Sequence, residues 1–328
     1  MNFFALIIGI ILLVYVTIDI IWTVLWIDGG AAPLTNIFAM TIWKLFKKQR
    51  TFKFVYQITG SVILISTLII WIMLAWVSWY LVLDAFVDPI INTINNRTLN
   101  SLDTFYFVGT SLFTFGNGGF APREGVVQLL STFISAYGMI ILSLGISYVI
   151  NAMSGVVKNR KYAADITTMG STIDEFILTL YDQDGFSDYS SYLNSLSSGL
   201  NEMASMYKAY PLICFYQSYD IRKSLAYSIS MLIDSLIIIQ SDITNDMDTH
   251  DLYIKQTLNA SNEYCEVVLK TMKIKEDIKE IQALNVEELL NSDLPINSNN
   301  INTVIEAFNQ YETLRSKAYT IRNYISAH

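Results

Sequence analysis

The sequence predicts an all-α membrane protein in which three transmembrane helices precede a helical bundle in water. Its residues are 52% hydrophobic and 15% charged, against roughly 25% charged in ordinary soluble domains. The charge is divided unevenly: residues 1–170 are mildly basic, and residues 171–328 carry most of the acids behind the net charge of −8. An apolar half followed by an acidic polar half indicates domains in different solvents, and no basic patch suits a nucleic acid.

Three apolar runs are long enough to cross a hydrocarbon core of about 30 Å as helices. The first is Phe3–Ile27, the second is Gly60–Leu83, and the third is Gln128–Ala152. A secretory signal is the alternative for the first run, but the run is long and no Lys or Arg precedes it. We therefore assign residues 1–28 to an N-terminal transmembrane helix.

The short loops with Lys and Arg fix the expected orientation, because such loops stay in the cytoplasm. One cluster follows the first span and another follows the third: Lys44, Lys47, Lys48, Arg50 and Lys53, then Lys158, Arg160 and Lys161. The chain is thus expected to be a multi-pass protein of the plasma membrane, with its N-terminus outside and its C-terminal domain in the cytoplasm.

The linker of residues 29–57 contains an amphipathic helix that we expect to lie in the cytoplasmic interface. Its apolar stripe is Leu34, Ile37, Phe38, Thr41, Ile42 and Leu45. Two interpretations stay open: a cuff coupled to a gate, and a linker that covers lipid.

Residues 101–122, between the second and third spans, predict a short helix followed by an extended return. Ser101 is the expected cap, and Asp103 stands in the first turn, where the helix dipole favours negative charge. Gly116, Gly118 and Gly119 then prevent the helix from continuing. Irregular backbone at membrane depth is tolerated where it lines water or is buried in protein. The pattern is that of a re-entrant loop.

The string Thr114-Phe115-Gly116-Asn117-Gly118 resembles the Thr-x-Gly-x-Gly filter of the potassium-channel family. Residues 114–122 are most similar to bacterial nonselective sodium-potassium channels. The resemblance covers a pore domain, residues 58–157, and implies a homotetramer that binds K⁺ or Na⁺ through the backbone carbonyls of Thr114, Phe115, Gly116 and Asn117. The expected fold is therefore a pore-loop tetrameric channel fold with three transmembrane helices and a cytoplasmic helical bundle.

Several positions depart from the potassium-selective pattern, among them Phe115, which replaces the usual Val or Ile. Asn117 stands where such channels carry Tyr or Phe, and Gly119 stands where they carry Asp. K⁺ is expected to permeate, and selectivity over Na⁺ stays open.

The third span carries the expected gate. Gly138 lies where the family has its inner-helix hinge, and close helix packing is the alternative interpretation of this glycine. Leu142, Ile146 and Ile150 form an apolar stripe that we expect to face the axis and to gate by dewetting.

Residues 158–328 predict an acidic helical domain. The helix that contains Leu232, Ile233 and Leu236–Ile239 is apolar nearly all round, so burial is expected. The acids at 242–251 do not fit a calcium loop, because Asp251 stands where the turn needs Gly if Asp246 is the first ligand. Cys214 and Cys265 are too few for a disulfide framework. Asp19 lies inside the first span, where an acidic residue is a candidate for a functional role. A structural role is the favoured interpretation.

The first hypothesis is a cation channel, with K⁺ or Na⁺ as the permeant ion and no cofactor. The alternative is a non-conducting membrane-anchored signalling or scaffold protein with a channel-like fold, and a third is a slowly conducting subunit of a transporter complex. An enzyme is not expected, because the two histidines suggest neither a catalytic set nor a metal-spaced pair. Membrane lipid and a homotetramer are the expected partners, and an unidentified ligand or protein is a candidate partner of the tail.

Overall fold

The computed structural model forms two compact units, which we call the membrane unit (Met1–Ile42 and Ser61–Asn151) and the tail unit (Trp43–Gly60 and Ala152–His328). Helices α3 and α5 contribute residues to both. The structure describes residues 2–47, 53–94, 99–116, 118–182, 185–186, 189–218, 220–242, 248–274 and 301–325.

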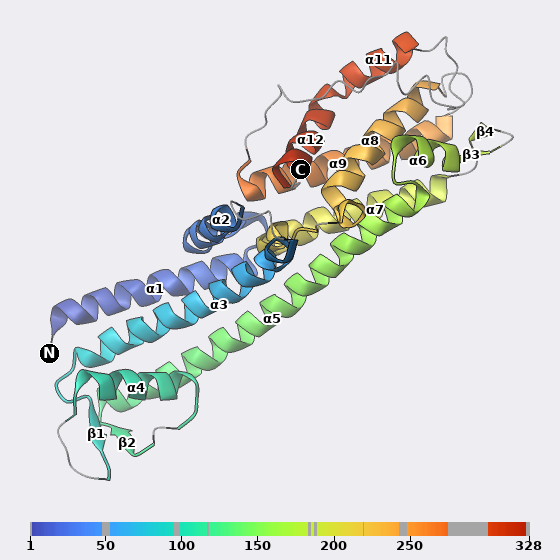
Figure 1. Cartoon of the computed structure of the whole chain (residues 1–328). Helices are drawn as coiled ribbons and strands as arrows, with labels where there is room; N and C mark the ends of the chain where they lie inside the picture. Colours follow the sequence, from blue (N-terminus) through green and yellow to red (C-terminus); the bar gives the residue numbers. More distant parts are fainter. Residues whose placement is uncertain are drawn as a thin grey trace. The chain divides into compact units, whose positions relative to one another are not determined.

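The described elements confirm the expectation of an all-α protein with three apolar helices of membrane-spanning length. In chain order the first part contains α1 (Phe3–Leu25), η1 (Ile27–Gly29), α2 (Pro33–Lys47), α3 (Lys53–Asp84), β1 (Ile90–Asn92), α4 (Ser101–Leu112), β2 (Phe120–Pro122) and α5 (Val126–Met169). The third helix continues well past the predicted end of its span at Ala152. Figure 1 shows α1, α3 and α5 side by side within the membrane unit.

One core of the membrane unit joins all three long helices. Val16 and Ile20 of α1 pack with Trp71 and Ala75 of α3 and with Ile141 of α5. The hydroxyls of Thr17 and Tyr137 are also hydrogen-bonded, at 2.8 Å. The first span is thus an integral part of this unit rather than a loose anchor.

Helix α2 leaves its predicted apolar stripe uncovered by the rest of the chain. Ile37, Phe38 and Leu45 are exposed, whereas Thr35 and Ala39, on another side of the helix, are buried. This arrangement is what an interfacial helix requires, because its apolar side must be free to meet lipid.

The tail unit is built from helices and one short hairpin. After α5 come α6 (Ile173–Leu180), β3 (Tyr181–Asp182), β4 (Gly185–Phe186), α7 (Ser190–Ala209), η2 (Pro211–Phe215), η3 (Ile221–Lys223), α8 (Leu225–Asp242), α9 (Asp248–Met272), α11 (Ile301–Gln310) and α12 (Glu312–Ile325). Helix α7 packs along α9, and α8 contacts α6, α9, α11 and α12. The apolar residues of α8 are buried, as the sequence predicts.

Candidate pore loop and the buried carboxylates

Helix α4 begins with a reciprocal cap. The Asn100 side chain accepts a hydrogen bond from the backbone N–H of Asp103, and the Asp103 carboxylate accepts one from the N–H of Asn100. The cap is Asn100 rather than the Ser101 that the sequence predicts, because Asn100 has the extended backbone of a cap residue and Ser101 is already helical. The predicted place of Asp103 in the first turn is confirmed.

The side of α4 that meets α3 depends on Gly109. A Cβ atom at this position would lie 2.2 Å from the Trp76 ring, so a larger residue would push the two helices apart. The Trp76 indole also stacks on Phe105 at 4.6 Å and donates a hydrogen bond to the Phe105 carbonyl. Sequence reasoning did not single out Gly109, although a glycine amid aromatic residues is typical of close helix contact.

The chain turns out of α4 through left-handed backbone. Gly116 and Gly118 have φ of 87° and 50°, and Gly119 has φ of 95°, so the predicted left-handed conformation of Gly116 and Gly118 is confirmed. Thr114 also has a positive φ, 56°, which costs a β-branched residue on the order of 1–3 kcal/mol. Asn117 lies outside the described residues.

The described part of one chain leaves the described residues of this loop uncovered. Thr114, Gly116 and Gly118 are exposed, and Phe115 is 82% exposed. An apolar ring so uncovered in a membrane protein is expected to meet lipid or another subunit.

A small hairpin returns the chain to α5. Strand β1 pairs with β2 in antiparallel fashion, from Ile90 opposite Pro122 to Asn92 opposite Phe120. Thr93 adds two hydrogen bonds, because both its N–H and its hydroxyl donate to the Gly119 carbonyl. The far end of the loop is therefore fastened to the segment that follows α3.

The predicted hinge glycine lies against the end of α4. A Cβ atom on Gly138 would be 1.9 Å from the carbonyl oxygen of Leu112, a backbone atom that cannot swing aside. This contact accounts for the glycine by packing, the alternative that the sequence left open. A hinge at Gly138 stays a prediction.

The predicted gate stripe falls on an uncovered face of α5 that extends beyond it. Ile146 and Ile150 are 60% and 63% exposed, whereas Leu142 lies half-buried at the rim of this face. The same face carries four exposed polar side chains at helical spacing: Thr132, Ser143, Ser147 and Asn151. Helical-wheel reasoning from the apolar residues alone missed these polar ones.

Asp19 of α1 is buried and caps the N-terminus of α2. Its carboxylate accepts hydrogen bonds from the N–H groups of Leu34 and Thr35 at 3.0 and 3.4 Å. It also accepts from the Thr35 hydroxyl at 2.6 Å and from the Trp71 indole at 3.0 Å. The structure thus gives Asp19 the structural role that the sequence analysis favoured: it ties α2 and α3 to the first span.

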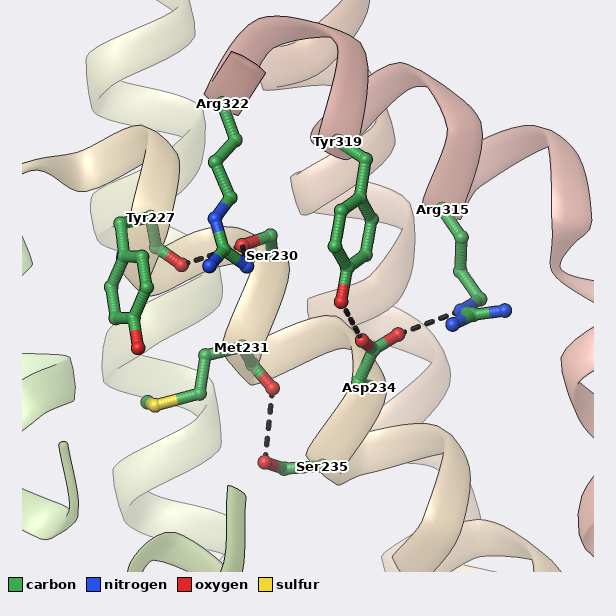
Figure 2. Close-up of polar contacts among 8 residues, drawn as sticks. All are labelled: Tyr227, Ser230, Met231, Asp234, Ser235, Arg315, Tyr319 and Arg322. Carbon is green, nitrogen blue, oxygen red and sulfur yellow. Dashed lines mark hydrogen bonds and ion pairs between the residues drawn. The ribbon is translucent and has the colours of Figure 1, made fainter. Parts of the chain in front are cut away.

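Asp234, in the middle of the apolar helix α8, is the second buried carboxylate. The Nε of Arg315 donates to it at 2.7 Å and the Tyr319 hydroxyl at 2.5 Å (Figure 2). The Asp234 side chain has no exposed surface, and that of Arg315 is 7% exposed. Burial raises the pKa of the Asp234 carboxyl above its ordinary value, and the charge of Arg315 opposes this rise without cancelling it.

A second arginine extends this cluster toward α5. Arg322 of α12 lies over the Tyr227 ring at 4.5 Å, and its Nη1 donates to the Ser230 hydroxyl at 3.4 Å (Figure 2). The Tyr227 hydroxyl in turn donates to the carbonyl of Ser171, in the turn that follows α5. Tyr227 thereby contacts both α12 and the segment at the end of α5.

The acidic stretch 242–251 is divided between two helices. Asp242 ends α8, Asp248 begins α9, and Asp246 lies outside the described residues. Within the ranges that the structure describes, no group of three His, Cys, Asp or Glu residues is placed to hold a metal ion.

One curated relative is similar to most of the chain. It is the "Uncharacterized membrane protein YdjJ" of Bacillus subtilis (strain 168), 28% identical over 269 residues, which cover 82% of this chain and 79% of that protein. No family model matches the chain, and no solved structure matches it. This similarity and the three apolar helices support one conclusion: the chain is a membrane protein.

Proposed function

We propose that the chain is one subunit of a tetrameric cation channel that conducts K⁺ through the backbone carbonyls of residues 114–117. One observation carries the proposal: between two membrane-length helices lies a capped short helix, then left-handed residues, then a return fastened to the outer segment. Strained backbone persists where the surrounding structure fixes it, and it is frequent at functional sites.

Two exposed surfaces support the assembly of several chains. The loop residues Thr114–Gly116 and Gly118 are uncovered in one chain, and so is the α5 face with Ser143, Ser147 and Ile150. Hydroxyl groups on a membrane helix are expected to face a water-filled path or a neighbouring helix rather than lipid. Both surfaces would be covered if four copies surrounded one axis, with the loops forming the filter and the α5 helices lining the path.

The direction of insertion is part of the proposal. The Lys and Arg clusters of the short loops favour a cytoplasmic tail unit and an outer N-terminus. The tail is then placed to bias opening through the contacts at the end of α5, where the Ser228 hydroxyl lies 3.4 Å from the Ala163 carbonyl and Tyr227 reaches Ser171.

The test is conduction by the purified full chain in planar bilayers, with Gly116→Ala as the variant. Gly125→Ala is a matched control, because both glycines have a φ near 90° and open space around the position of a Cβ. Each variant carries a similar local strain, on the order of 1 kcal/mol. Only Gly116→Ala is expected to abolish unitary currents while tetramers persist.

The outcomes separate the candidate functions. Current that persists in Gly116→Ala would refute the filter assignment. Silence of intact wild-type tetramers would favour a non-conducting scaffold with a channel-like fold.

Selectivity is tested at Asn117, which replaces an aromatic residue of the potassium-selective pattern. Asn117→Tyr is expected to shift the bi-ionic reversal potential toward K⁺ selectivity. An unchanged ratio of Na⁺ to K⁺ permeability would show that this side chain does not set it.

A further inference from the structure

A groove follows the last turns of α1 and ends at η1. It is largely open on one side, has a volume of about 470 Å³, and is lined by Ile18, Ile21, Trp22, Leu25, Trp26, Ile27 and Asp28. That volume lies within the range of small-molecule sites in proteins. Every lining residue except Asp28 is apolar or aromatic, so the groove suits an apolar ligand with one polar end.

The aromatic wall of the groove is held in place. The rings of Trp22 and Trp26 are 4.9 Å apart, and the Trp22 indole donates a hydrogen bond to the Gly29 carbonyl at 3.2 Å. A Cβ atom on Gly29 would lie 2.5 Å from the Trp22 nitrogen, so this approach requires glycine. The wall is therefore formed before any ligand arrives.

The groove has the polarity of one lipid in one leaflet and follows most of the depth of that leaflet. From Ile18 to Leu25, the last residue of α1, the chain rises about 10 Å at the helical rise per residue, against about 15 Å for half of a hydrocarbon core. Helix α1 ends at Leu25, so Ile18 lies toward the bilayer centre and Asp28 lies at the surface. Trp22 and Trp26 stand near that end, where indoles favour the headgroup level.

The charge at the mouth of the groove selects the headgroup. Asp28 is exposed, and no described cation forms an ion pair with its carboxylate. A primary ammonium can donate hydrogen bonds to this carboxylate, whereas a trimethylammonium cannot and an anionic headgroup is repelled. We propose that this groove binds a phospholipid with a primary amine headgroup, such as phosphatidylethanolamine, its acyl chain along Trp22 and Trp26 and its ammonium on Asp28.

The proposal depends on the membrane-embedded α1 and not on conduction, so it can fail or succeed independently of the channel. A second copy of the chain is the competing occupant. A groove that is apolar toward the bilayer centre and anionic at the surface matches the acyl chain and headgroup of a lipid, whereas a neighbouring helix does not require this arrangement.

The test is quenching of Trp26 fluorescence by lipids brominated on their acyl chains. The full chain is reconstituted in phosphatidylcholine vesicles with a fixed fraction of brominated phosphatidylethanolamine, phosphatidylcholine or phosphatidylglycerol. The Trp26 signal is the difference between the wild-type chain and Trp26→Phe, a change at an exposed side chain. Phosphatidylethanolamine is expected to bind about two- to fivefold more tightly than phosphatidylcholine, as one exposed ion pair permits, with phosphatidylglycerol weakest.

Variants at the mouth decide the role of Asp28. Asp28→Asn is expected to remove the preference, and Asp28→Glu is expected to retain it. Asp88→Asn, at an exposed acid beyond the end of α3 that lies 3.9 Å from Arg123, is a control that also removes one surface charge and should leave the preference unchanged. Equal binding of the three lipids, a preference for phosphatidylglycerol, or a Trp26 that none of them quenches would overturn the proposal, the last because protein would then occupy the groove.

Discussion

Each of the two units contains a buried carboxylate, and the two carboxylates are stabilised in different ways. Asp19 of the membrane unit accepts four hydrogen bonds from uncharged donors, two of them at the N-terminus of α2. Asp234 of the tail unit accepts from a buried guanidinium and a phenol. Asp19 relies on backbone dipoles and on neutral donors from two other helices, and Asp234 relies on a cation from a helix far along the chain.

The difference affects how each site depends on its partners. No single partner of Asp19 carries the opposite charge, so the loss of one donor leaves the others in place. Asp234 has one cation at 2.7 Å, Arg315, and one Nη of that arginine is buried with no hydrogen bond to a described residue. A pair that is incompletely satisfied contributes little net stability, yet its disruption leaves a charge stranded in the interior.

The largest effect is therefore expected from Arg315→Met. The variant strands the Asp234 carboxylate among the apolar residues of α8 and should lower the free energy of unfolding by about 3–5 kcal/mol. Burial already raises the pKa of Asp234, and loss of the arginine raises it further. A raised pKa in the folded state means that stability is lost as pH rises through it, so the defect should be deeper at pH 8 than at pH 5.

The companion of that experiment is the double variant Asp234→Leu with Arg315→Met, measured by urea unfolding of the full chain in mild detergent. Replacing both charges by apolar groups should recover most of the loss and abolish its pH dependence. A double variant as unstable as the single one would show that Arg315 acts through its packing on Phe308, at 4.2 Å, rather than through the charge.

A smaller effect is expected at Asp19. Asp19→Ala removes the acceptor of four donors and should cost about 3 kcal/mol, the sum of a lost cap and of buried donors left without partners. Asp19→Asn keeps one acceptor oxygen and should cost about half as much. Amide hydrogen exchange of residues 33–47 measures the release of α2, and equal protection in all three chains would contradict the proposed cap.

Single neutral donors sharpen the comparison further. Tyr319→Phe and Trp71→Phe each remove one donor to a buried carboxylate and should cost about 1 kcal/mol. Tyr319→Phe is expected to be the more harmful, because Asp234 keeps only Arg315 while Asp19 keeps three donors. Thermal unfolding of both variants under one condition measures which of the two loses more stability. A larger loss in Trp71→Phe than in Tyr319→Phe would show that the two carboxylates do not differ as described.

The sequence predicts the loop better than it predicts these carboxylates. Left-handed backbone at Gly116 and Gly118 follows from the residue type, because glycine alone adopts it without strain. The positive φ of Thr114 could not be predicted, since its β-branched side chain opposes that conformation. The three membrane helices can be predicted because the composition and length of an apolar run are read directly from the local sequence.

Long-range partners escape such reasoning. Arg315 lies 81 residues from Asp234, and Trp71 lies 52 residues from Asp19, so no periodicity links either pair. Gly138 shows the same limit: a hinge and a close packing contact both favour glycine, and only the structure shows the contact with the Leu112 carbonyl.

The smallest change in the free energy of unfolding is expected when an exposed carboxylate, that of Glu202, is replaced. Glu202 is the exposed carboxylate with which the two buried carboxylates are compared. Lys158 and Tyr162 of α5 donate to it, and these hydrogen bonds lower the pKa of Glu202 below its usual value. A lowered pKa stabilises the fold above the unfolded value, about 4.3, and that stability is lost as pH falls through the folded value. With Glu202 substantially exposed, Glu202→Gln should cost at most about 0.5 kcal/mol at pH 7.

Urea unfolding from pH 2.5 to pH 8 should show the Glu202→Gln and wild-type curves converging as pH falls below about 4.3, the opposite of the trend expected for Arg315→Met. Tyr162→Phe, which removes one of the two donors, should give an intermediate curve. If the free energies of unfolding of Glu202→Gln and the wild type instead diverged further below pH 4.5, the fold would not stabilise the charged form of the Glu202 carboxylate. The contrast between Glu202 and Asp234 would then reflect burial alone.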